Sequence, residues 1–95
     1  MKYLITGRWK APVPPEQAPE LWQAAKDWMS SRLENATLDC HYPFPDVSGG
    51  MVIANYDSHE AVWEDIISFP LSPYLAWEIE ALCEWEYVYD KTIEA

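Results

Sequence analysis

The sequence predicts a single α+β domain with four strands and two helices in the order β-α-β-β-α-β. Two kinds of periodicity support this prediction: apolar and polar residues alternate in four segments, and apolar residues recur at helical spacing in two others. Stretches rich in proline or glycine separate these segments. The order is that of a ferredoxin-like sandwich, an antiparallel sheet with both helices on one face.

The first strand and the first helix are joined by a proline-rich connection. A strand is predicted over residues 2–10, KYLITGRWK, because apolar side chains alternate along it. Residues 11–18 contain three prolines and cannot pair as a central strand. A helix is predicted from Pro19 to about Glu34, since proline suits a first helical turn. Its apolar stripe consists of Leu21, Trp22, Ala25, Trp28, Met29 and Leu33.

A hairpin is predicted from two further strands, 35–44 and 51–56, which flank a turn containing two glycines. Alternation along the first of these strands places Asp39 and His41 on one face. The residues expected on the opposite face are Leu38, Cys40 and Tyr42.

The second helix and the last strand follow in the final third of the chain. Ser58 is the expected N-cap of a helix whose buried stripe includes Val62 and Ile66. Prolines 70 and 73 end this helix and turn the chain. A long strand is then predicted from Trp77 to Tyr89, because one face is apolar and the other is mostly acidic.

The composition favours an oligomer. A chain of 95 residues forms one domain, residues 1–95, and a monomer of this size would struggle to bury six Trp, six Tyr and two Phe. Leu4, Leu82 and Val88 also fall on the sheet face away from the helices, where they are too apolar for an open surface. We therefore expect a homodimer, or a higher homo-oligomer, in which two chains cover these faces mutually.

Charge excludes several classes of partner. Six basic residues against sixteen acidic ones give a formal charge of −10, which repels nucleic acids and anionic membrane surfaces. No apolar run approaches the length of a membrane span, and no signal-peptide core follows Met1. The expected location is the cytoplasm, and the expected partner besides a second copy is a small-molecule ligand.

The cysteines and histidines predict neither a disulfide nor a metal site. Cys40 and Cys83 lie on strands expected at opposite edges of the sheet, too far apart for an intrachain disulfide. His41 and His59 fall outside any zinc-like spacing. We therefore expect no metal and no other cofactor.

Candidate catalytic groups gather on the predicted sheet face away from the helices. His41 or Glu78 is the candidate base, Arg8 the candidate anion-binding group, and Asp39 the residue that orients His41. Further residues expected to bind substrate are Asn55, Tyr74 and Glu80. A purely structural interpretation remains open beside these roles. His41 can equally be a partly exposed strand residue near a proline turn, and alternate Glu residues commonly form a solvated face.

The stretch from the second helix to the last strand resembles a known family. Ser58, the Pro70-Leu71 and Pro73-Tyr74 pairs, Glu78 and the Leu82-Cys83 pair match muconolactone Δ-isomerase at the same spacings without a gap. The family's polar and basic residues after the last pair are replaced here by Glu84 and Trp85, and its first-strand His by Leu4. The resemblance implies a dimeric α+β barrel that assembles further into a ring. It also implies an enzyme without cofactor, which moves a double bond in an unsaturated lactone acid by shifting a proton.

Two functions therefore stand side by side. The first is a cofactor-independent isomerase or cyclase that acts by proton transfer on a small unsaturated carbonyl or lactone compound. The alternative is a non-catalytic small-molecule-binding or interaction protein that uses the same barrel cavity, which the six tryptophans favour. A haem- or oxygen-dependent monooxygenase is the weakest hypothesis, because neither histidine has the context of an axial ligand.

Overall fold

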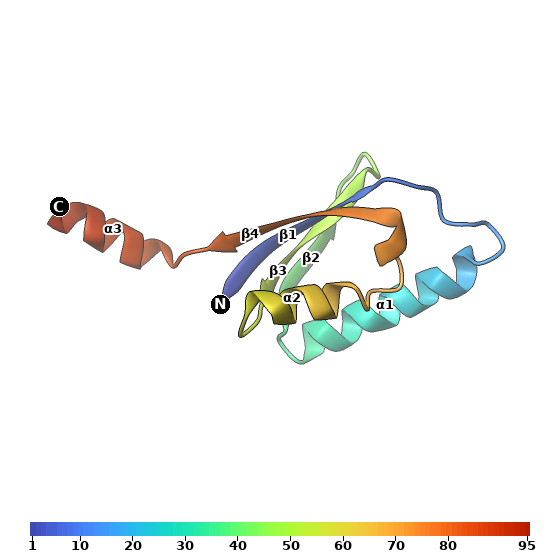
Figure 1. The fold of residues 1–95 in the computed structure, drawn as a ribbon, viewed down its shortest axis with the longest axis horizontal. Coiled ribbons are helices and arrows are strands. Elements are labelled where there is room, and N and C mark those ends of the chain that lie inside the picture. Colours follow the sequence, from blue (N-terminus) through green and yellow to red (C-terminus); the bar gives the residue numbers. More distant parts are fainter.

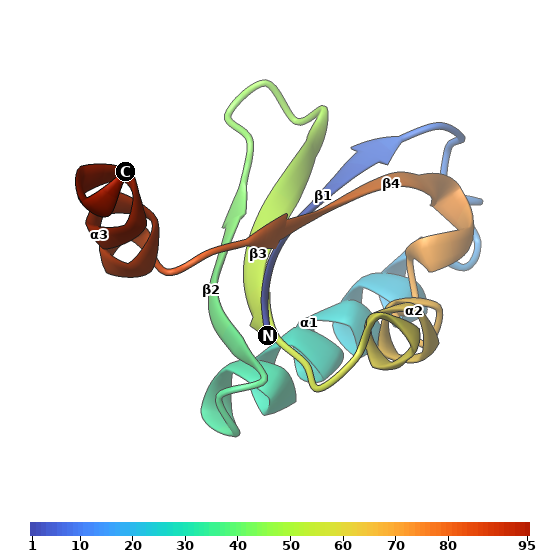
Figure 2. The ribbon, with the colours of Figure 1, turned by 60° about the vertical axis from the view of Figure 1, so that its left-hand side comes forward.

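Four strands form one antiparallel sheet in the order β2-β3-β1-β4, and two helices cover one of its faces (Figures 1 and 2). The computed structural model describes residues 1–95. Its elements are β1 (Lys2–Trp9), α1 (Ala18–Glu34), β2 (Leu38–Pro43), β3 (Gly49–Asn55), α2 (His59–Ile66), a 3-10 turn (Ser72–Tyr74), β4 (Leu75–Leu82) and α3 (Trp85–Glu94). The predicted ferredoxin-like order of strands and helices is confirmed, with α3 as an addition at the C-terminus.

The core lies between the helices and the sheet face that they cover, which we call the inner face. Tyr3 and Ile5 of β1 are each 1% exposed and pack with Val62 and Ile66 of α2. Residues two apart in a strand, and residues four apart in a helix, point to the same side, so both side chains of each pair face the core. The opposite side of the sheet, the outer face, has no helix over it (Figure 2).

Helix α2 begins as the sequence predicts. The Ser58 side chain accepts a hydrogen bond from the Ala61 backbone N–H at 3.1 Å, which satisfies one of the free donors of the first turn. Prolines after the helix then lead through the turn Ser72–Tyr74 into β4. The N-cap and the proline crossing are both confirmed.

The predicted alternation along β2 is wrong from Cys40 onward. The pairing of β2 with β3 shifts by one residue between Leu38 and Cys40, so that His41 lies opposite Val52. A bulge of this kind adds one residue to one strand, and each later side chain then points to the other face. His41 therefore faces the helices, whereas Asp39 remains on the outer face.

The last strand is shorter than predicted. Trp77–Tyr89 was expected to be extended, but β4 ends at Leu82 and the chain continues as α3 from Trp85. The reason is the length of the neighbouring strand: Leu82 pairs with Lys2, the first residue of β1, so a longer β4 would have no partner in this sheet. A helix satisfies its backbone groups internally and needs no neighbour.

The two cysteines are free and belong to opposite edges of the sheet. Cys40 lies in the edge strand β2, and Cys83 directly follows the other edge strand, β4. The predicted placement of these strands is thus confirmed. None of the helices has the length and apolar character that crossing a membrane requires.

The N-cap gives the first testable prediction. Replacing Ser58 by Ala should lower the free energy of unfolding by about 1 kcal/mol, because the Ala61 N–H loses its acceptor. Urea unfolding followed by circular dichroism measures the change. Ser30→Ala, at an exposed position inside α1, is the matched control and should leave stability unchanged or raise it slightly. Equal losses in the two variants would contradict the assigned cap.

Candidate functional site

The inner face of the sheet and α1 enclose a cavity of about 200 Å³. Its walls are mainly apolar: 16 of the 21 lining residues are hydrophobic. Large aromatic side chains dominate, from both helical and strand segments. They are Trp9, Trp22, Trp28, Phe44, Tyr56, Phe69 and Trp77.

Gly7 of β1 makes room for the Trp77 ring, which forms part of the cavity wall. A Cβ on Gly7 would lie 2.7 Å from the Trp77 ring, closer than real Cβ contacts allow. The indole therefore lies across the backbone of β1, and its N–H donates to Ser72 Oγ at 3.1 Å. Gly7 and Ser72 together fix the orientation of Trp77 in the cavity.

His41 is the histidine of this cavity, and no carboxylate, lysine or arginine lines it. Its Nδ1 lies 3.2 Å from the Met51 carbonyl oxygen. Because a carbonyl only accepts hydrogen bonds, this contact places the proton of the neutral ring on Nδ1. Nε2 is then left with a free lone pair, which is the atom that a general base needs.

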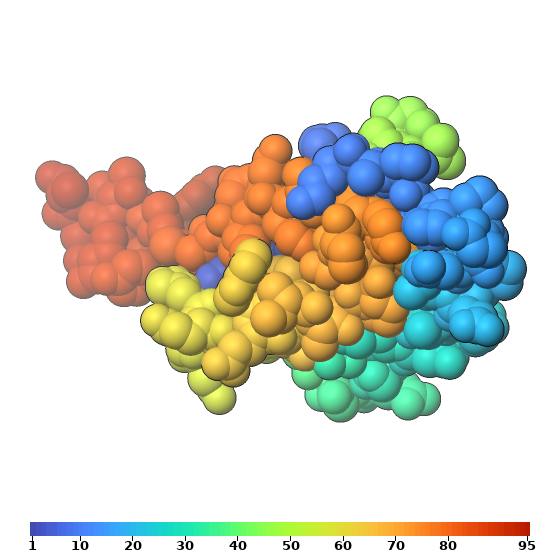
Figure 3. Space-filling model, turned by 45° about the vertical axis from the view of Figure 1, so that its right-hand side comes forward, coloured from blue at the N-terminus to red at the C-terminus, as the bar shows by residue number.

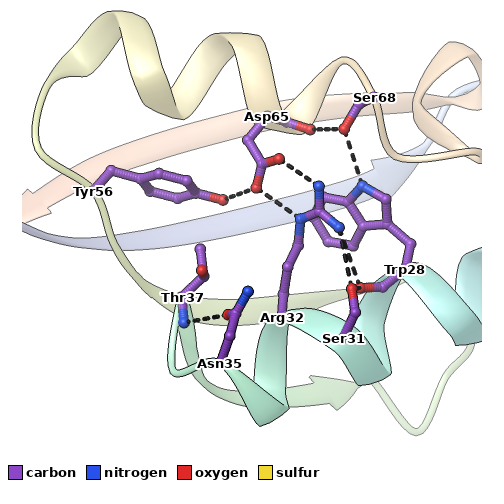
Figure 4. Close-up of polar contacts among 8 residues, drawn as sticks. All are labelled: Trp28, Ser31, Arg32, Asn35, Thr37, Tyr56, Asp65 and Ser68. Atoms are coloured by element: carbon purple, nitrogen blue, oxygen red, sulfur yellow. Dashed lines mark hydrogen bonds and ion pairs between the residues drawn. The ribbon is translucent and has the colours of Figure 1, made fainter.

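A network between α1 and α2 holds two aromatic walls of the cavity (Figure 4). Asp65 accepts a hydrogen bond from the Tyr56 hydroxyl at 2.6 Å and a two-pronged ion pair from Arg32 at 2.6 and 2.8 Å. The Arg32 guanidinium lies 3.8 Å from the centre of the Trp28 ring. The Trp28 N–H in turn donates to Ser68 Oγ at 3.0 Å. Trp28 and Tyr56 are thus fixed from behind.

Charges in this network stabilise structure and leave no free acid or base. The hydrogen bonds from Arg32 lower the pKa of Asp65, and the same contact raises the pKa of Arg32. Burial, reinforced by the bond to Asp65, raises the pKa of Tyr56 far above its ordinary value. The Tyr56 hydroxyl therefore stays protonated and committed to Asp65.

Three of the predicted site residues lie on the outer face. Glu78 and Glu80 are exposed and stand opposite Thr6 and Leu4 of β1. Neither forms an ion pair. The Arg8 guanidinium instead lies over the Phe44 ring, 5.2 Å from its centre. The sheet separates all three from His41.

Asp39 does not orient His41, because it is engaged at the other end of the outer face. It accepts a hydrogen bond from the Asn55 amide at 2.7 Å and pairs with Lys2. The Lys2 ammonium also donates to the Asn55 side chain at 3.0 Å. The structure thus brings Asp39 and Asn55 together as a structural trio with Lys2, apart from the cavity.

Tyr74 is a packing residue in the structure. It lies beside the small cluster formed by Leu71 and Leu75, and its carbonyl accepts from the Lys10 N–H at 3.0 Å. It is absent from the cavity walls. Among the residues singled out from the sequence for catalysis or binding, only His41 lines the cavity.

The aromatic walls are what sequence reasoning missed. Trp22 and Trp28 were assigned to the core stripe of a helix, yet both line the cavity. The available signal was the excess of large rings on inner-face positions of a chain too short to pack them all. In the structure, no group of three or more His, Cys, Asp or Glu side chains is placed to hold a metal ion.

The fold and the cavity define a ferredoxin-like α+β protein with an aromatic pocket between sheet and helices. The solved structure of muconolactone isomerase shares this fold with a TM-score of 0.79 and 22% sequence identity, over 88% of this chain and 90% of that one. A second structure is 5-chloro-2-hydroxyhydroquinone dehydrochlorinase from Burkholderia phenoliruptrix AC1100, in complex with 2,5-dihydroxybenzoquinone. It has a TM-score of 0.70 and 16% identity, over 92% and 98% of the two chains. No protein-family model and no curated protein matches the sequence.

The network behind the cavity gives a pH-dependent prediction. Replacing Asp65 by Asn should cost roughly 1–3 kcal/mol of unfolding free energy at neutral pH, because Arg32 loses its charged partner. The pKa of Asp65 is lowered by folding, so its contribution is complete above the unfolded value of about 4 and is lost as the pH falls through the folded value. The difference between wild type and variant should therefore shrink in acid.

Urea unfolding at neutral pH and in acid measures this difference. Asp27→Asn, at an exposed position of α1, is the control and should change stability little at either pH. A variant at Asp65 whose deficit stayed constant down to the most acidic pH would contradict the ion-pair account.

Proposed function

We propose that this protein is a cofactor-independent isomerase or cyclase that transfers a proton within a small unsaturated carbonyl or lactone compound. The observation that carries the proposal is His41 Nε2, a free basic nitrogen in an apolar cavity. The shared fold supports it, since the two similar structures are an isomerase and a dehydrochlorinase. Both names denote enzymes that act on small molecules.

The proposed reaction needs only a base that returns its proton. Nε2 of His41 takes a proton from the carbon beside a carbonyl group, and the electron pair left behind is delocalised onto the carbonyl oxygen. The imidazolium then delivers the same proton to another carbon of the conjugated system, which moves the double bond. No redox partner or co-reactant enters the balance.

The remaining donors of the cavity suit the enolate oxygen. The indole N–H groups of Trp28 and Trp77 are engaged with Ser68 and Ser72. Trp9 and Trp22 line the same space, and we propose that their indole N–H groups, which have no such partner, donate to the developing charge. An apolar site strengthens these hydrogen bonds because little water competes.

The volume limits the substrate. A cavity of about 200 Å³ is smaller than the roughly 300–1,000 Å³ of pockets that hold drug-sized molecules. We propose a substrate with one ring and few substituents. The aromatic walls favour a flat, conjugated ring over a flexible chain.

We also propose that the working unit is at least a homodimer. Leu82 remains 38% exposed on the outer face, which also carries Leu4 of β1 and its partner Ile53 of β3. A second copy would cover this surface as in a dimeric α+β barrel. Arg8 and Glu78, on the same face, would then lie at the interface between the two chains.

Ligand binding without catalysis is the second candidate function. The observation in its favour is that the cavity walls contain four tryptophans but no carboxylate, lysine or arginine. Quenching of intrinsic tryptophan fluorescence by unsaturated lactones tests binding, and the same solutions analysed for new products test turnover. Tight quenching with no product after prolonged incubation would favour this function.

The catalytic proposal predicts a contrast between two faces of the sheet. His41→Gln should lower kcat by about 10²–10⁴-fold, the usual contribution of a general base, whereas Glu78→Gln should retain near-normal kcat. The assay is proton NMR in D₂O with a panel of unsaturated lactones and cyclic enones, which reports both the moved double bond and deuterium at the new C–H. Full activity in His41→Gln, or loss only in Glu78→Gln, would overturn the assignment.

A further inference from the structure

The polar side chains in the cavity wall offer a ligand few groups, and these are neutral. They are one tyrosine, one histidine and four tryptophans. The Tyr56 hydroxyl donates to Asp65, and two of the indole N–H groups donate to serines outside the lining. What remains for a ligand is the lone pair of His41 Nε2 and the indole N–H groups of Trp9 and Trp22.

Two arginines lie against residues of the wall without entering the cavity. The Arg32 guanidinium is 3.8 Å from the centre of the Trp28 ring, and its charge is paired with Asp65. The Arg8 guanidinium is 5.2 Å from the centre of the Phe44 ring, on the outer face, and this side chain is exposed. Neither arginine is part of the cavity lining. Their charges are thus balanced outside the cavity, by Asp65 and by water.

The four lysines are also absent from the lining. Lys2 and Lys91 are engaged in ion pairs, and Lys10 and Lys26 are exposed. Lys91 belongs to α3, which stands clear of the rest of the molecule (Figures 1 and 3). None of the six basic side chains therefore meets a ligand inside the cavity.

A carboxylate would enter this cavity without a countercharge. An ionised group that leaves water for an apolar space needs an opposite charge and hydrogen bonds to replace its hydration. Indole N–H groups supply only part of this, since neutral donors form weaker hydrogen bonds than charged ones. The net charge of −10 also repels anions that approach the protein. An uncharged ring meets neither obstacle.

His41 is the side chain of the wall that could carry a positive charge. Its Nδ1 proton is directed at the Met51 carbonyl oxygen, 3.2 Å away, so a positive ring would hold its second proton on Nε2. A carboxylate bound at Nε2 would favour this protonated form. It would thereby remove the lone pair that the proposed reaction needs. A charged substrate would thus disable the base on which its own conversion depends.

We propose that the substrate of this cavity is uncharged: a single conjugated ring with a carbonyl group and without a carboxylate. This choice of substrate rests on the proposed function and narrows it. It differs from the lactone acid that the family resemblance implies. The carbonyl oxygen is held by the neutral N–H groups of Trp9 and Trp22, and the ring by the aromatic walls.

A matched pair of small compounds tests the charge of the ligand. Both contain a cyclohexenone ring, which carries on its alkene carbon an acetyl group in one compound and a carboxyl group in the other. The two groups have nearly the same size, and the carboxyl group is ionised at neutral pH. NMR titration of the tryptophan indole N–H signals of the full-length protein gives a dissociation constant for each compound. We expect the carboxylate to bind at least about tenfold more weakly, because it loses hydration without gaining a countercharge.

A substitution at the mouth of the cavity provides the second arm of the test. Val47 lines the cavity and is 80% exposed, so replacing it leaves the core intact. Val47→Lys brings an ammonium group to the cavity and should reduce the ratio of the two dissociation constants several-fold. Val47→Gln introduces a neutral polar side chain in the same place. It is the matched control and should leave the ratio close to that of the wild type.

The possible outcomes separate the charge of the substrate from the proposed reaction. Carboxylate binding as tight as that of the acetyl compound would overturn the uncharged substrate and leave the proposed reaction standing. A ratio that Val47→Lys and Val47→Gln change equally would do the same. Binding of neither compound would contradict the proposed function itself, and this choice of substrate with it.

Discussion

The pairing of β2 with β3 changes register between Leu38 and Cys40, and the chemistry of the cavity depends on this irregularity. Without the bulge, His41 would point to the outer face beside Asp39, and the cavity would contain only apolar walls and the engaged Tyr56 hydroxyl. With it, an imidazole enters a space lined by aromatic rings and is oriented by the Met51 carbonyl. The one additional residue in β2 therefore turns the candidate base, His41, into the cavity and away from the acidic outer face.

The cavity has one fixed side and one open side. Behind it, Asp65 holds Tyr56 and Arg32 through charge-assisted hydrogen bonds, which are shorter and stronger than neutral ones. The Arg32 guanidinium in turn lies over the Trp28 ring. At the mouth, Trp22 is exposed and no polar network restrains it. The cavity thus combines a rigid rear wall with an exposed entrance beside Trp22.

Much of the fold follows from local signals in the sequence. Alternation located the four strands, the Ser58 cap located α2, and the prolines located the crossing before β4. These features depend on residues close together in the chain. The end of β4 does not: it is set by Lys2, the residue with which Leu82 pairs, and alternation continues past that point to Tyr89. A pattern of period two reports that a strand is possible, whereas a partner strand decides whether it forms.

The site was less predictable than the fold for a related reason. A bulge adds one residue and leaves no mark in a short alternating segment, so the predicted face is reversed for each β2 residue from Cys40 onward. That reversal removed Asp39, Glu78 and Arg8 from the surroundings of His41. The aromatic walls were visible in the sequence as a surplus of rings, but a filled core and a lined cavity contain the same residue types.

The account rests on the inner cavity being the ligand site, and the six tryptophans allow this to be measured directly. Fluorine NMR of protein labelled with 5-fluorotryptophan, with signals assigned by single Trp→Phe variants, reports each indole separately during titration with a five-membered unsaturated lactone. The cavity residues Trp9, Trp22, Trp28 and Trp77 should shift with one common affinity, while Trp63, exposed on α2, should not. Shifts at Trp63 without shifts at the cavity residues would contradict the account.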